Sequence, residues 1–519
     1  MLRMKRWLSF VLVMAMLLCA GVGVAESTVA LPISEEPITL KMAVAYSSYC
    51  LVPWSEKEFY HEVSEATNVY FEWQELQDWS TQTNLMINSG DMPDVFFGAV
   101  DSNLLNENRE MFWELTEMIE QYCPTLTQAF AEQPYLVAKL KSSDGGIYKL
   151  PIGFADIVDA KVGTMYWINQ AWLDAVGMES PTTIDELQEV LIAFRDMDPN
   201  GNGLQDEIPL SLAEQDWAGK FSSLFGIFGV LYDSATFVDC DDEGNVYFQP
   251  SQDEFYEALV WLNGLAKEGL LDQESFTQDG TLIGTKIAQD MIGIVAKYNP
   301  LNMLDNFVPL GIIEGPNEKT LYEGTNTIVP GNISIPKTCE HPEAVLQVWE
   351  YINSDMTRKL SNRYGEEGVY WSYTGNGTDF TLQDYDSTPP EGYEFWDQYI
   401  YTVGETGSSG FQLFTRADMS HNKSEYTARE AAIVQYEPYF PAVDYQEATL
   451  ETDLATEKSM LLTEIEAYVT NFVANAVFSG IDEAAWETHL ATLEQLQVDR
   501  YVELCQAAYD GFYAMSSIE

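Results

Sequence analysis

Hydrophobic and polar residues alternate in the first part of the chain in a way that predicts strands separated by helices. Apolar residues occupy every second position from 38 to 44, which is the period of a β-strand. A helical pattern covers residues 55–66, a strand-like run covers residues 69–73, a helix ends at Gly90, and a buried strand begins near Asp94. This order of strand, helix, strand, helix, strand predicts a parallel α/β sheet with right-handed crossovers.

A second set of predicted elements begins at residue 165. A buried strand over residues 165–169 precedes two helices, and further buried strands are predicted over residues 291–296 and 332–335. The intervening residues 308–323 are rich in Gly, Pro and charge, as expected where the chain crosses back to the first unit. Two long helices are predicted over residues 253–268 and 452–475. The sequence therefore predicts two α/β units.

The N-terminus has the features of a secretory signal peptide. Three basic residues precede a short apolar run, and small residues at and before Ala25 place the expected cleavage after that residue, so that the signal peptide spans residues 1–25. No other stretch approaches the ~18 apolar residues that a membrane span needs. We expect an extracellular protein that is secreted and associated with the cell surface. Lipid attachment at Cys19 is the weaker alternative, because the bulky Leu18 precedes it.

Charge and cysteine usage exclude several classes of protein. The formal net charge of −57 would repel nucleic acid and anionic membranes, and it disfavours a polyanionic ligand. The alternative interpretation of this charge is a solvated acidic coat that aids solubility. The six cysteines are scattered singly along the chain, which fits neither a disulfide framework nor a CxxC metal site. We expect a monomer.

The sequence D-P-N-G-N-G-L-Q-D-E, residues 198–207, resembles a calcium-binding loop. Oxygen-bearing side chains alternate with turn-forming residues, as in an EF-hand loop, in which position six is glycine and position seven supplies a main-chain carbonyl. Position twelve, normally a bidentate Glu, is Pro209, so Glu207 is the expected closing carboxylate. The expected ligands of a structural Ca²⁺ are Asp198, Asn200, Asn202, the carbonyl of Leu204, Asp206 and Glu207. The alternative is a polar Asn-Gly turn without metal.

Several longer motifs resemble one protein family. The stretches S-G-D-M-P-D-V from Ser89 and D-G-G-I-Y-K-L-P from Asp144 resemble the first lobe of the extracellular solute-binding proteins of carbohydrate ABC importers. The stretch W-I-N-Q-A-W-L-D-A-V-G-M from Trp167, together with the calcium-loop motif, is similar to the second lobe of family 1, in its large Gram-positive branch of lipoprotein-LplA-like members. The stretches K-E-G-L-L-D-Q-E-S-F-T-Q-D from Lys267 and G-E-E-G-V-Y-W from Gly365 resemble the same branch.

The resemblance implies a two-lobed α/β fold of the periplasmic-binding-protein type II, with a hinge and a cleft between the lobes. It implies lobe I at residues 26–158 and about 312–360, and lobe II at residues 159–311 and about 361–519. Such a protein captures a mono- or oligosaccharide and delivers it to the permease subunits of an ABC transporter, without catalysis. Two alternatives stay open: a secreted glycoside hydrolase, whose carboxylate pair depends on the fold, and a surface protein that binds peptides or glycans.

Residues in the loops that follow the predicted strands are the candidates for sugar binding. Ligands of open α/β sheets bind at the carboxyl ends of strands, and aromatic planes with nearby carboxylates suit the apolar faces and hydroxyls of sugars. The candidates are Tyr46, Trp54, Asp101, Tyr166, Trp217, Tyr298 and Trp371. The alternative for each aromatic residue is packing in the core. Many family members have Gly-Trp after the strand near residue 295, where this chain has Lys297-Tyr298.

Overall fold

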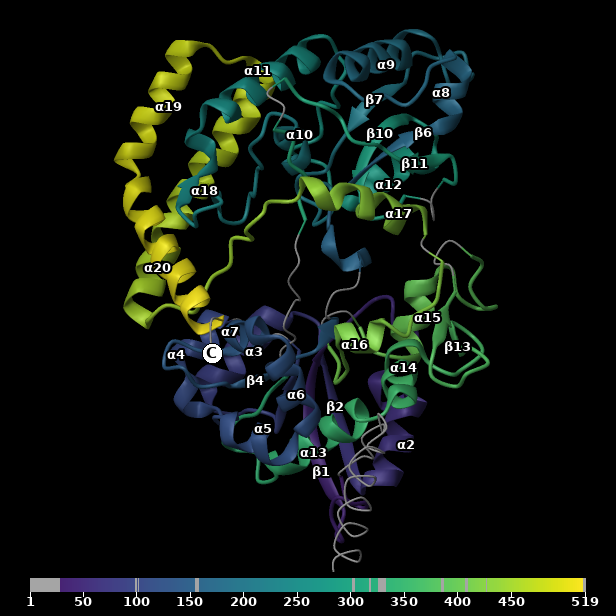
Figure 1. Cartoon of the computed structure of the whole chain (residues 1–519), viewed down its shortest axis with the longest axis vertical. Coiled ribbons are helices and arrows are strands. Elements are labelled where there is room, and N and C mark those ends of the chain that lie inside the picture. The colour runs from purple at the N-terminus through teal and green to yellow at the C-terminus, as the bar shows by residue number, and fades with distance from the viewer. Residues whose placement is uncertain are drawn as a thin grey trace, which may run out of the picture.

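The chain forms two lobes that lie one above the other in Figure 1. The structure is a computed structural model, and it describes residues 29–98, 100, 102–154, 158–300, 304–316, 319–324, 333–383, 387–406, 409–425 and 427–516. The expected signal peptide lies outside the described residues. In the described part of the chain, no helix combines the length and the apolar character that crossing a membrane requires.

Lobe I, the lower lobe in Figure 1, is built on a five-stranded sheet with the strand order β2-β1-β3-β12-β4. Strand β1 is parallel to β2 and β3, which confirms the parallel sheet predicted from the alternating pattern, whereas β12 is antiparallel to β3 and β4. The strands are β1 (Ile38–Ala45), β2 (Val69–Leu76), β3 (Val95–Phe97), β4 (Lys149–Leu150) and β12 (Ile333–Ser334). β12 shows that the chain returns to this sheet late in the sequence.

Helices pack on the sheet of lobe I, because their apolar side chains and those of the sheet are buried against one another. The alternate apolar side chains of β1 belong to one buried cluster that includes residues of α5, α6 and α13. The helix predicted to stop at Gly90 does so, since Gly90 has a φ of 74° that favours glycine. The helices and 3-10 turns are η1 (Trp54–Glu56), α2 (Glu58–Thr67), α3 (Trp79–Ser89), α4 (Ser102–Glu107), η2 (Arg109–Met111), α5 (Thr116–Tyr122), α6 (Pro124–Glu132), α7 (Pro134–Leu140) and α13 (Pro342–Asn353).

Lobe II has a four-stranded sheet with the order β11-β6-β10-β7. Strand β10 is parallel to β7 and antiparallel to β6, so the end of β10 lies at the same edge as the end of β7 and the beginning of β6. The strands are β6 (Met165–Asn169), β7 (Ile208–Ser211), β10 (Ile292–Lys297) and β11 (Phe307–Pro309), and β8 (Val238–Cys240) pairs with β9 (Val246–Phe248) in a separate ribbon. The chain enters lobe II through η3 (Val158–Lys161).

The helices of lobe II enclose the largest buried cluster of the described chain. Thr183 caps one of them, α9, by accepting a hydrogen bond from Glu186 N. The helices and 3-10 turns are α8 (Gln170–Val176), α9 (Ile184–Asp196), α10 (Ser222–Gly226), η4 (Gln249–Ser251), α11 (Asp253–Lys267), α12 (Gly280–Ala288), α17 (Ala428–Tyr436), η5 (Glu437–Tyr439), α18 (Thr452–Ser479), α19 (Glu483–Gln495) and α20 (Val498–Ser516).

The segment that follows α13 packs on lobe I, and this corrects the expected return to lobe II at about residue 361. Phe411 and Leu413 lie in the buried cluster of lobe I, and β15 pairs with β5 (Gly153–Phe154). Lys57 of lobe I donates a hydrogen bond to Gly404 O at 2.6 Å. The elements of this segment are α14 (Met356–Tyr364), β13 (Trp371–Tyr373), β14 (Phe380–Leu382), α15 (Trp396–Val403), β15 (Leu413–Phe414) and α16 (Arg416–Met419). The chain re-enters lobe II only at α17, on the lobe II side of the gap in Figure 1.

The C-terminal helices join the two lobes away from these crossings. Helix α20 packs against α7 of lobe I as well as against α18 of lobe II. Asn106 Nδ2 of lobe I donates to Leu450 O at 3.3 Å, just before α18 begins. The lobes are therefore held together on one side, where α18 and α20 descend to lobe I in Figure 1.

Candidate functional site

Three of the predicted sugar-binding residues are core residues, which corrects those predictions. Trp54 and Trp371 are each 1% exposed and Tyr166 is 4% exposed. The Trp54 ring centroid lies 4.9 Å from that of Trp73. Trp371 Nε1 donates to a main-chain oxygen, and Tyr166 Oη donates to Lys220 O at 2.8 Å. Neighbouring side chains enclose these rings, so a ligand has no access to them in this structure.

Two other candidates lie together at the end of parallel strands in lobe II. Trp217 is in the loop after β7, and Tyr298 directly follows β10. Their ring centroids are 5.3 Å apart with the planes tilted by 39°. Trp217 is 68% exposed, which is unusual for so large an apolar side chain. We call Trp217 and Tyr298 the aromatic platform.

Arg429 supports the platform from beneath. Its guanidinium carbon lies 4.0 Å from the centroid of the Tyr298 ring, and its side chain donates to Val162 O. Arg429 is in the first turn of α17, where the chain re-enters lobe II, and Val162 follows η3, where the chain first enters lobe II. The second crossing therefore contacts the platform directly and the first is linked to it through Arg429, which places the platform on the face of lobe II that meets lobe I.

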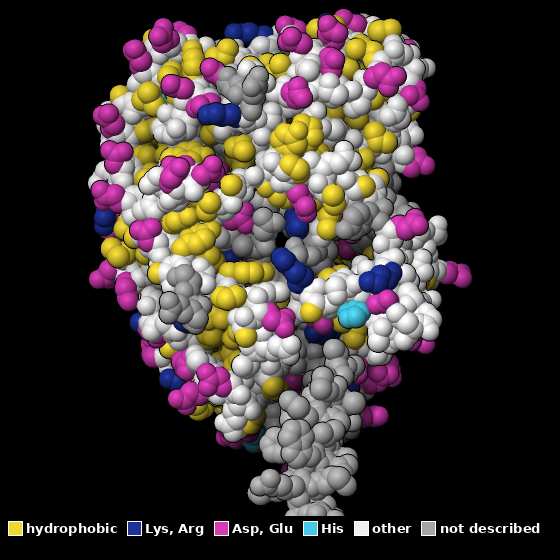
Figure 2. All heavy atoms as spheres, viewed as in Figure 1, with side chains coloured by type: hydrophobic (Ala, Val, Ile, Leu, Met, Phe, Trp, Pro, Cys, Tyr) yellow, Lys and Arg dark blue, Asp and Glu magenta, His cyan; other side chains and the backbone are white. Residues whose placement is uncertain are grey.

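The shape of the molecular surface is consistent with an aromatic platform that faces lobe I. Figure 2 shows the face of the molecule hollowed between the two lobes, with Lys and Arg side chains at the edge of the hollow. Tyr46, another predicted candidate, directly follows β1 in lobe I and is 46% exposed. Figure 1 shows β1 and β2 rising from the lower end of lobe I toward lobe II. Asp101 lies outside the described residues.

The loop that carries Trp217 is a tight turn. Ala213 N donates to Gly219 O at 3.0 Å, and Asp216 N donates to Ala213 O at 2.7 Å. A Cβ at Gly219 would lie 2.5 Å from Ala213 O, so only glycine fits there. Trp217 is at the tip of this turn, between Asp216 and Ala218, which explains its exposure.

Charged residues around the platform are paired. Lys297 Nζ lies 3.6 Å from Asp216 Oδ2, and both side chains are largely buried. Burial raises the pKa of Glu214 in the same loop, while Lys220, with Nζ 3.7 Å from Glu214 Oε1, partly opposes that shift. The sequence reading did not single out Asp216 or Arg429. No local pattern marks them, because tertiary contacts alone bring them to the platform.

The predicted calcium loop connects α9 to β7. It lies at the start of β7, whereas the aromatic platform lies at the end of this strand. Gly203 N donates to Asp198 Oδ2 at 3.1 Å, and Asn202 Nδ2 donates to Asp206 Oδ1 at 3.0 Å. Asp198 has a φ of 47°, which turns its side chain into the loop. Asn200 Nδ2 donates to Asp290 O at 3.1 Å and so ties the loop to the residues before β10.

Two carboxylate oxygens in this loop fit a cation. Asp198 Oδ1 and Glu207 Oε1 are shielded from solvent and accept no hydrogen bond from a described residue. Burial raises the pKa of Glu207, and the charges of Asp198 and Asp206 raise it further. Within the described residues, no three Asp, Glu, His or Cys side chains are already gathered as a metal site. The remaining predicted ligands are amide oxygens and a main-chain carbonyl, which suit a hard cation.

A separate pocket of about 770 Å³ lies on lobe I near the start of α18. Three of its lining side chains bond to one another: Arg109 Nε lies 3.2 Å from Asp144 Oδ2, and Tyr148 Oη donates to Asp144 at 2.8 Å. The pocket is away from the aromatic platform, and the described residues that line it offer no exposed aromatic pair of that kind. It is therefore a weaker candidate than the platform.

The two-lobed α/β fold is that of the periplasmic-binding-protein-like solute-binding proteins. The structure of the Streptococcus pneumoniae ABC-transporter substrate-binding protein FusA in complex with kestose matches with a TM-score of 0.79 at 23% identity, covering 92% of this chain and 99% of that chain. A FusA EF-hand mutant in complex with fructo-nystose matches equally well, with a TM-score of 0.79. The predicted fold class is therefore confirmed.

Sequence similarity points to the same group of proteins. The chain is 31% identical over 304 residues to the fructooligosaccharide ABC transporter substrate-binding protein FusA of Streptococcus pneumoniae serotype 4 (strain ATCC BAA-334 / TIGR4), covering 56% of each chain. It is 25% identical over 325 residues to the polygalacturonan/rhamnogalacturonan-binding protein YtcQ of Bacillus subtilis (strain 168), covering 58% of this chain and 60% of YtcQ. The chain thus spans little more than half the length of these curated relatives. No family model matches the chain.

Proposed function

We propose that this protein is an extracellular receptor that captures an oligosaccharide between its lobes and delivers it to the permease subunits of an ABC importer. The observation that carries the proposal is the aromatic platform, an exposed indole beside a phenol at the lobe II face that meets lobe I. Aromatic planes bind the apolar faces of sugar rings. The two relatives reported above are named as binding proteins, which supports a receptor over a hydrolase.

The ligand in this proposal is a neutral oligosaccharide. Lys297 is paired with Asp216, and Arg429 is 4% exposed and covered by the Tyr298 ring. Neither of these two cations is therefore accessible to a uronate carboxylate that stacks on the platform. The formal net charge of −57 would add repulsion at longer range.

The mechanism in this proposal is closure of the lobes on the sugar. A ligand favours the closed form only when it contacts both lobes there, because its differential affinity for the two forms sets the shift. Trp217 would provide the contact on lobe II, and Tyr46 and its neighbours the contact on lobe I. The joined side at α7 and α20 would restrict the movement to a rotation about that side.

Calcium in this proposal braces lobe II. Asp198, Asn200, Asn202, the carbonyl of Leu204, Asp206 and Glu207 would hold it, and the two unsatisfied carboxylate oxygens support this assignment. The ion would supply charge compensation to these carboxylates. The EF-hand mutant among the FusA structures agrees with a calcium loop in related proteins.

A glycan panel tests the function. Thermal shift and calorimetry with kestose, nystose, galacturonan oligosaccharides and alginate oligosaccharides should show stabilisation by a neutral member, with the glycan recovered intact by chromatography. Preferential binding of the acidic oligosaccharides would overturn the neutral class. Release of shorter sugars would instead identify a hydrolase, and the absence of any glycan binding would refute the receptor.

A further inference from the structure

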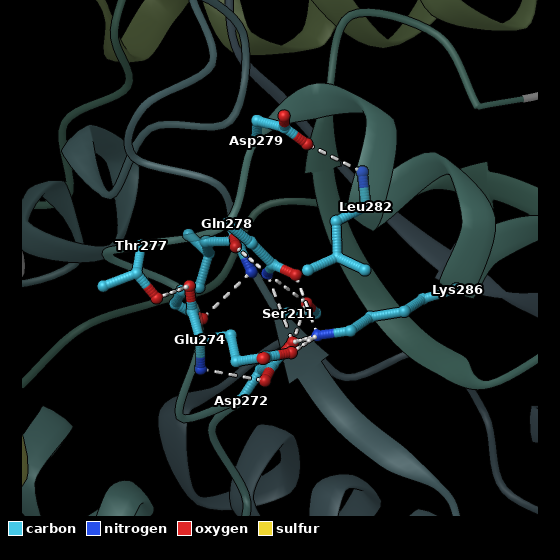
Figure 3. Close-up of polar contacts among 10 residues, drawn as sticks. Ser211, Asp272, Glu274, Thr277, Gln278, Asp279, Leu282 and Lys286 are labelled. Atoms are coloured by element: carbon cyan, nitrogen blue, oxygen red, sulfur yellow. Dashed lines mark hydrogen bonds and ion pairs between the residues drawn. The ribbon is translucent and has the colours of Figure 1, made fainter.

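A buried charged network lies directly behind the loop that carries Trp217. Figure 3 shows Lys286 of α12 pointing at Asp272 and Gln278, with Ser211 at the end of β7 beside them. Lys286 Nζ donates to Asp272 Oδ2 at 2.7 Å and to Gln278 Oε1 at 2.8 Å. None of these three side chains belongs to the exposed surface, since their residues are at most 9% exposed.

The network reaches the strand end through two residues. Ser211 Oγ donates to Asp272 Oδ2 at 2.6 Å, and Gln278 Nε2 donates to Ser211 Oγ at 3.0 Å and to Leu212 O. Burial disfavours the charged form of Asp272, but the hydrogen bonds from Lys286 and Ser211 outweigh this effect, so that its pKa is lowered. Lys286 Nζ also lies 2.7 Å from Glu274 Oε2, whose side chain is 55% exposed, so the ammonium has three partners and the pair with Asp272 is charged.

The segment that carries this network also forms the base of the Trp217 loop. Leu212 N donates to Ser275 Oγ at 3.2 Å, and Glu214 N donates to Ser275 O at 2.9 Å. A Cβ at Gly280 would lie 2.2 Å from Asp216 Oδ2, so the start of α12 packs closely on the residue before Trp217. The loop thus rests on residues 272–280 along its whole first half.

We infer that Lys286, Asp272 and Gln278 are positioning residues for ligand binding, which hold the Trp217 loop so that the indole lies beside Tyr298. The chain of contacts runs from the ion pair through the end of β7 to the tip of the loop. None of the three side chains reaches the surface that carries Trp217 and Tyr298. This inference rests on the proposed function, because it assigns these residues to the affinity of the same platform.

A fluorine NMR measurement tests the positioning without a ligand. Purified protein labelled with 5-fluorotryptophan should give a Trp217 resonance that Trp217→Phe identifies by its loss. Lys286→Met should shift or broaden this resonance. The matched control is Lys359→Met, because Lys359 forms a similarly buried pair with Asp418 at 2.7 Å outside the lobe II sheet. An unchanged Trp217 resonance in Lys286→Met would overturn the inference.

Lys286→Met leaves Asp272 without its cation, so a second variant covers the case in which it does not fold. Gln278→Met removes the bonds to Ser211 and Leu212 while the Lys286 ion pair with Asp272 remains. It should disturb the Trp217 resonance in the same way. A folded Gln278→Met protein with the wild-type resonance would equally contradict the inference.

A double-mutant cycle tests the link to affinity. With kestose as the probe, or the tightest neutral member of the panel, Lys286→Met should weaken binding by about tenfold. In the Trp217→Ala background the same change should have almost no further effect, and Lys359→Met should change affinity in neither background. Additive losses would show that Lys286 does not act through Trp217. If the wild-type protein binds no glycan, the proposed function fails, while the fluorine spectra still decide the positioning.

Discussion

The loop before β7, which we call the entering loop, and the loop after it, the leaving loop, lie at opposite ends of this strand. They are stabilised by different contacts. β7 has four residues, so the two loops are separated by about 13 Å. The entering loop, residues 198–207, is held mainly by bonds among its own Asp and Asn side chains and main chain. The leaving loop, residues 212–219, has main-chain bonds of its own and is held in addition from outside, by Ser275 and Gln278.

This difference indicates which kind of partner each loop can bind. The entering loop leaves oxygens of Asp198 and Glu207 without a partner among the described residues, so a cation would complete it. The leaving loop has its main chain satisfied by its own turn and by residues 275 and 278, so its tip can expose Trp217. In the proposed function, one strand would therefore connect a loop that holds calcium with a loop that binds the glycan.

The largest effect is expected at an aromatic residue that belongs to neither loop. Trp371→Ala should destabilise the protein by about 3–5 kcal/mol, because it opens a cavity beneath β13 and removes the bond to Gly365 O. Chemical denaturation measures this loss. Glycan affinity of the folded fraction should be unchanged. A loss of affinity without a loss of stability would return Trp371 to the binding site.

The next effect in size concerns the entering loop. With calcium at about 100 times its dissociation constant, binding would stabilise the fold by about 2.7 kcal/mol. Asp198→Ala should lose this stabilisation, so that its melting temperature falls much further below that of the wild type in calcium than in EDTA, where the variant loses only the bond from Gly203 N. Equal losses in both buffers would show that Asp198 has only a structural role and holds no metal.

The leaving loop should show the opposite response. Trp217→Ala should weaken glycan binding by about 2 kcal/mol, or about thirtyfold in Kd, because it removes the exposed indole of the platform. Its melting temperature without glycan should stay close to that of the wild type, since the side chain is 68% exposed. Calorimetry and thermal melts on the same samples separate the two quantities. A destabilised variant with unchanged affinity would reverse the assignment of the two loops.

Local patterns in the sequence were sufficient to predict most of the long elements. The alternation in β1 and the apolar run of β10 are set by burial on the two faces of a sheet, and both strands form where predicted. The calcium-loop motif is also local, so its residues could be listed from spacing. The late return to lobe II was missed because β15 and β5 pair over only two residues and leave no period to detect.

The exposure of aromatic residues could not be predicted in the same way. Trp54 and Trp217 both follow strands, yet one is enclosed by Trp73 and Lys57 and the other stands at the tip of a turn. Trp73 belongs to β2, so the residues around Trp54 do not reveal that this ring covers it. Arg429 likewise reaches Tyr298 only through the placement of α17. The fold was therefore more predictable than the site.

The smallest effect is expected from pH at the entering loop. Burial and the nearby Asp198 and Asp206 raise the folded-state pKa of Glu207. Folding therefore favours the protonated form, and this contribution, present below the unfolded pKa of about 4.3, is lost as pH rises through the raised folded value. Glu207→Gln copies the protonated form and avoids this loss.

In EDTA at pH 7, Glu207→Gln should thus be as stable as the wild type or more stable, by less than about 1 kcal/mol. Below pH 4 the two proteins should converge. In calcium the order should reverse, because Gln lacks the charge that the ion would bind. Melting temperatures across pH in both buffers measure the crossing. A variant less stable than the wild type in EDTA at pH 7 would mean that the Glu207 carboxylate already has a favourable partner, and the entering loop would no longer need a cation to complete it.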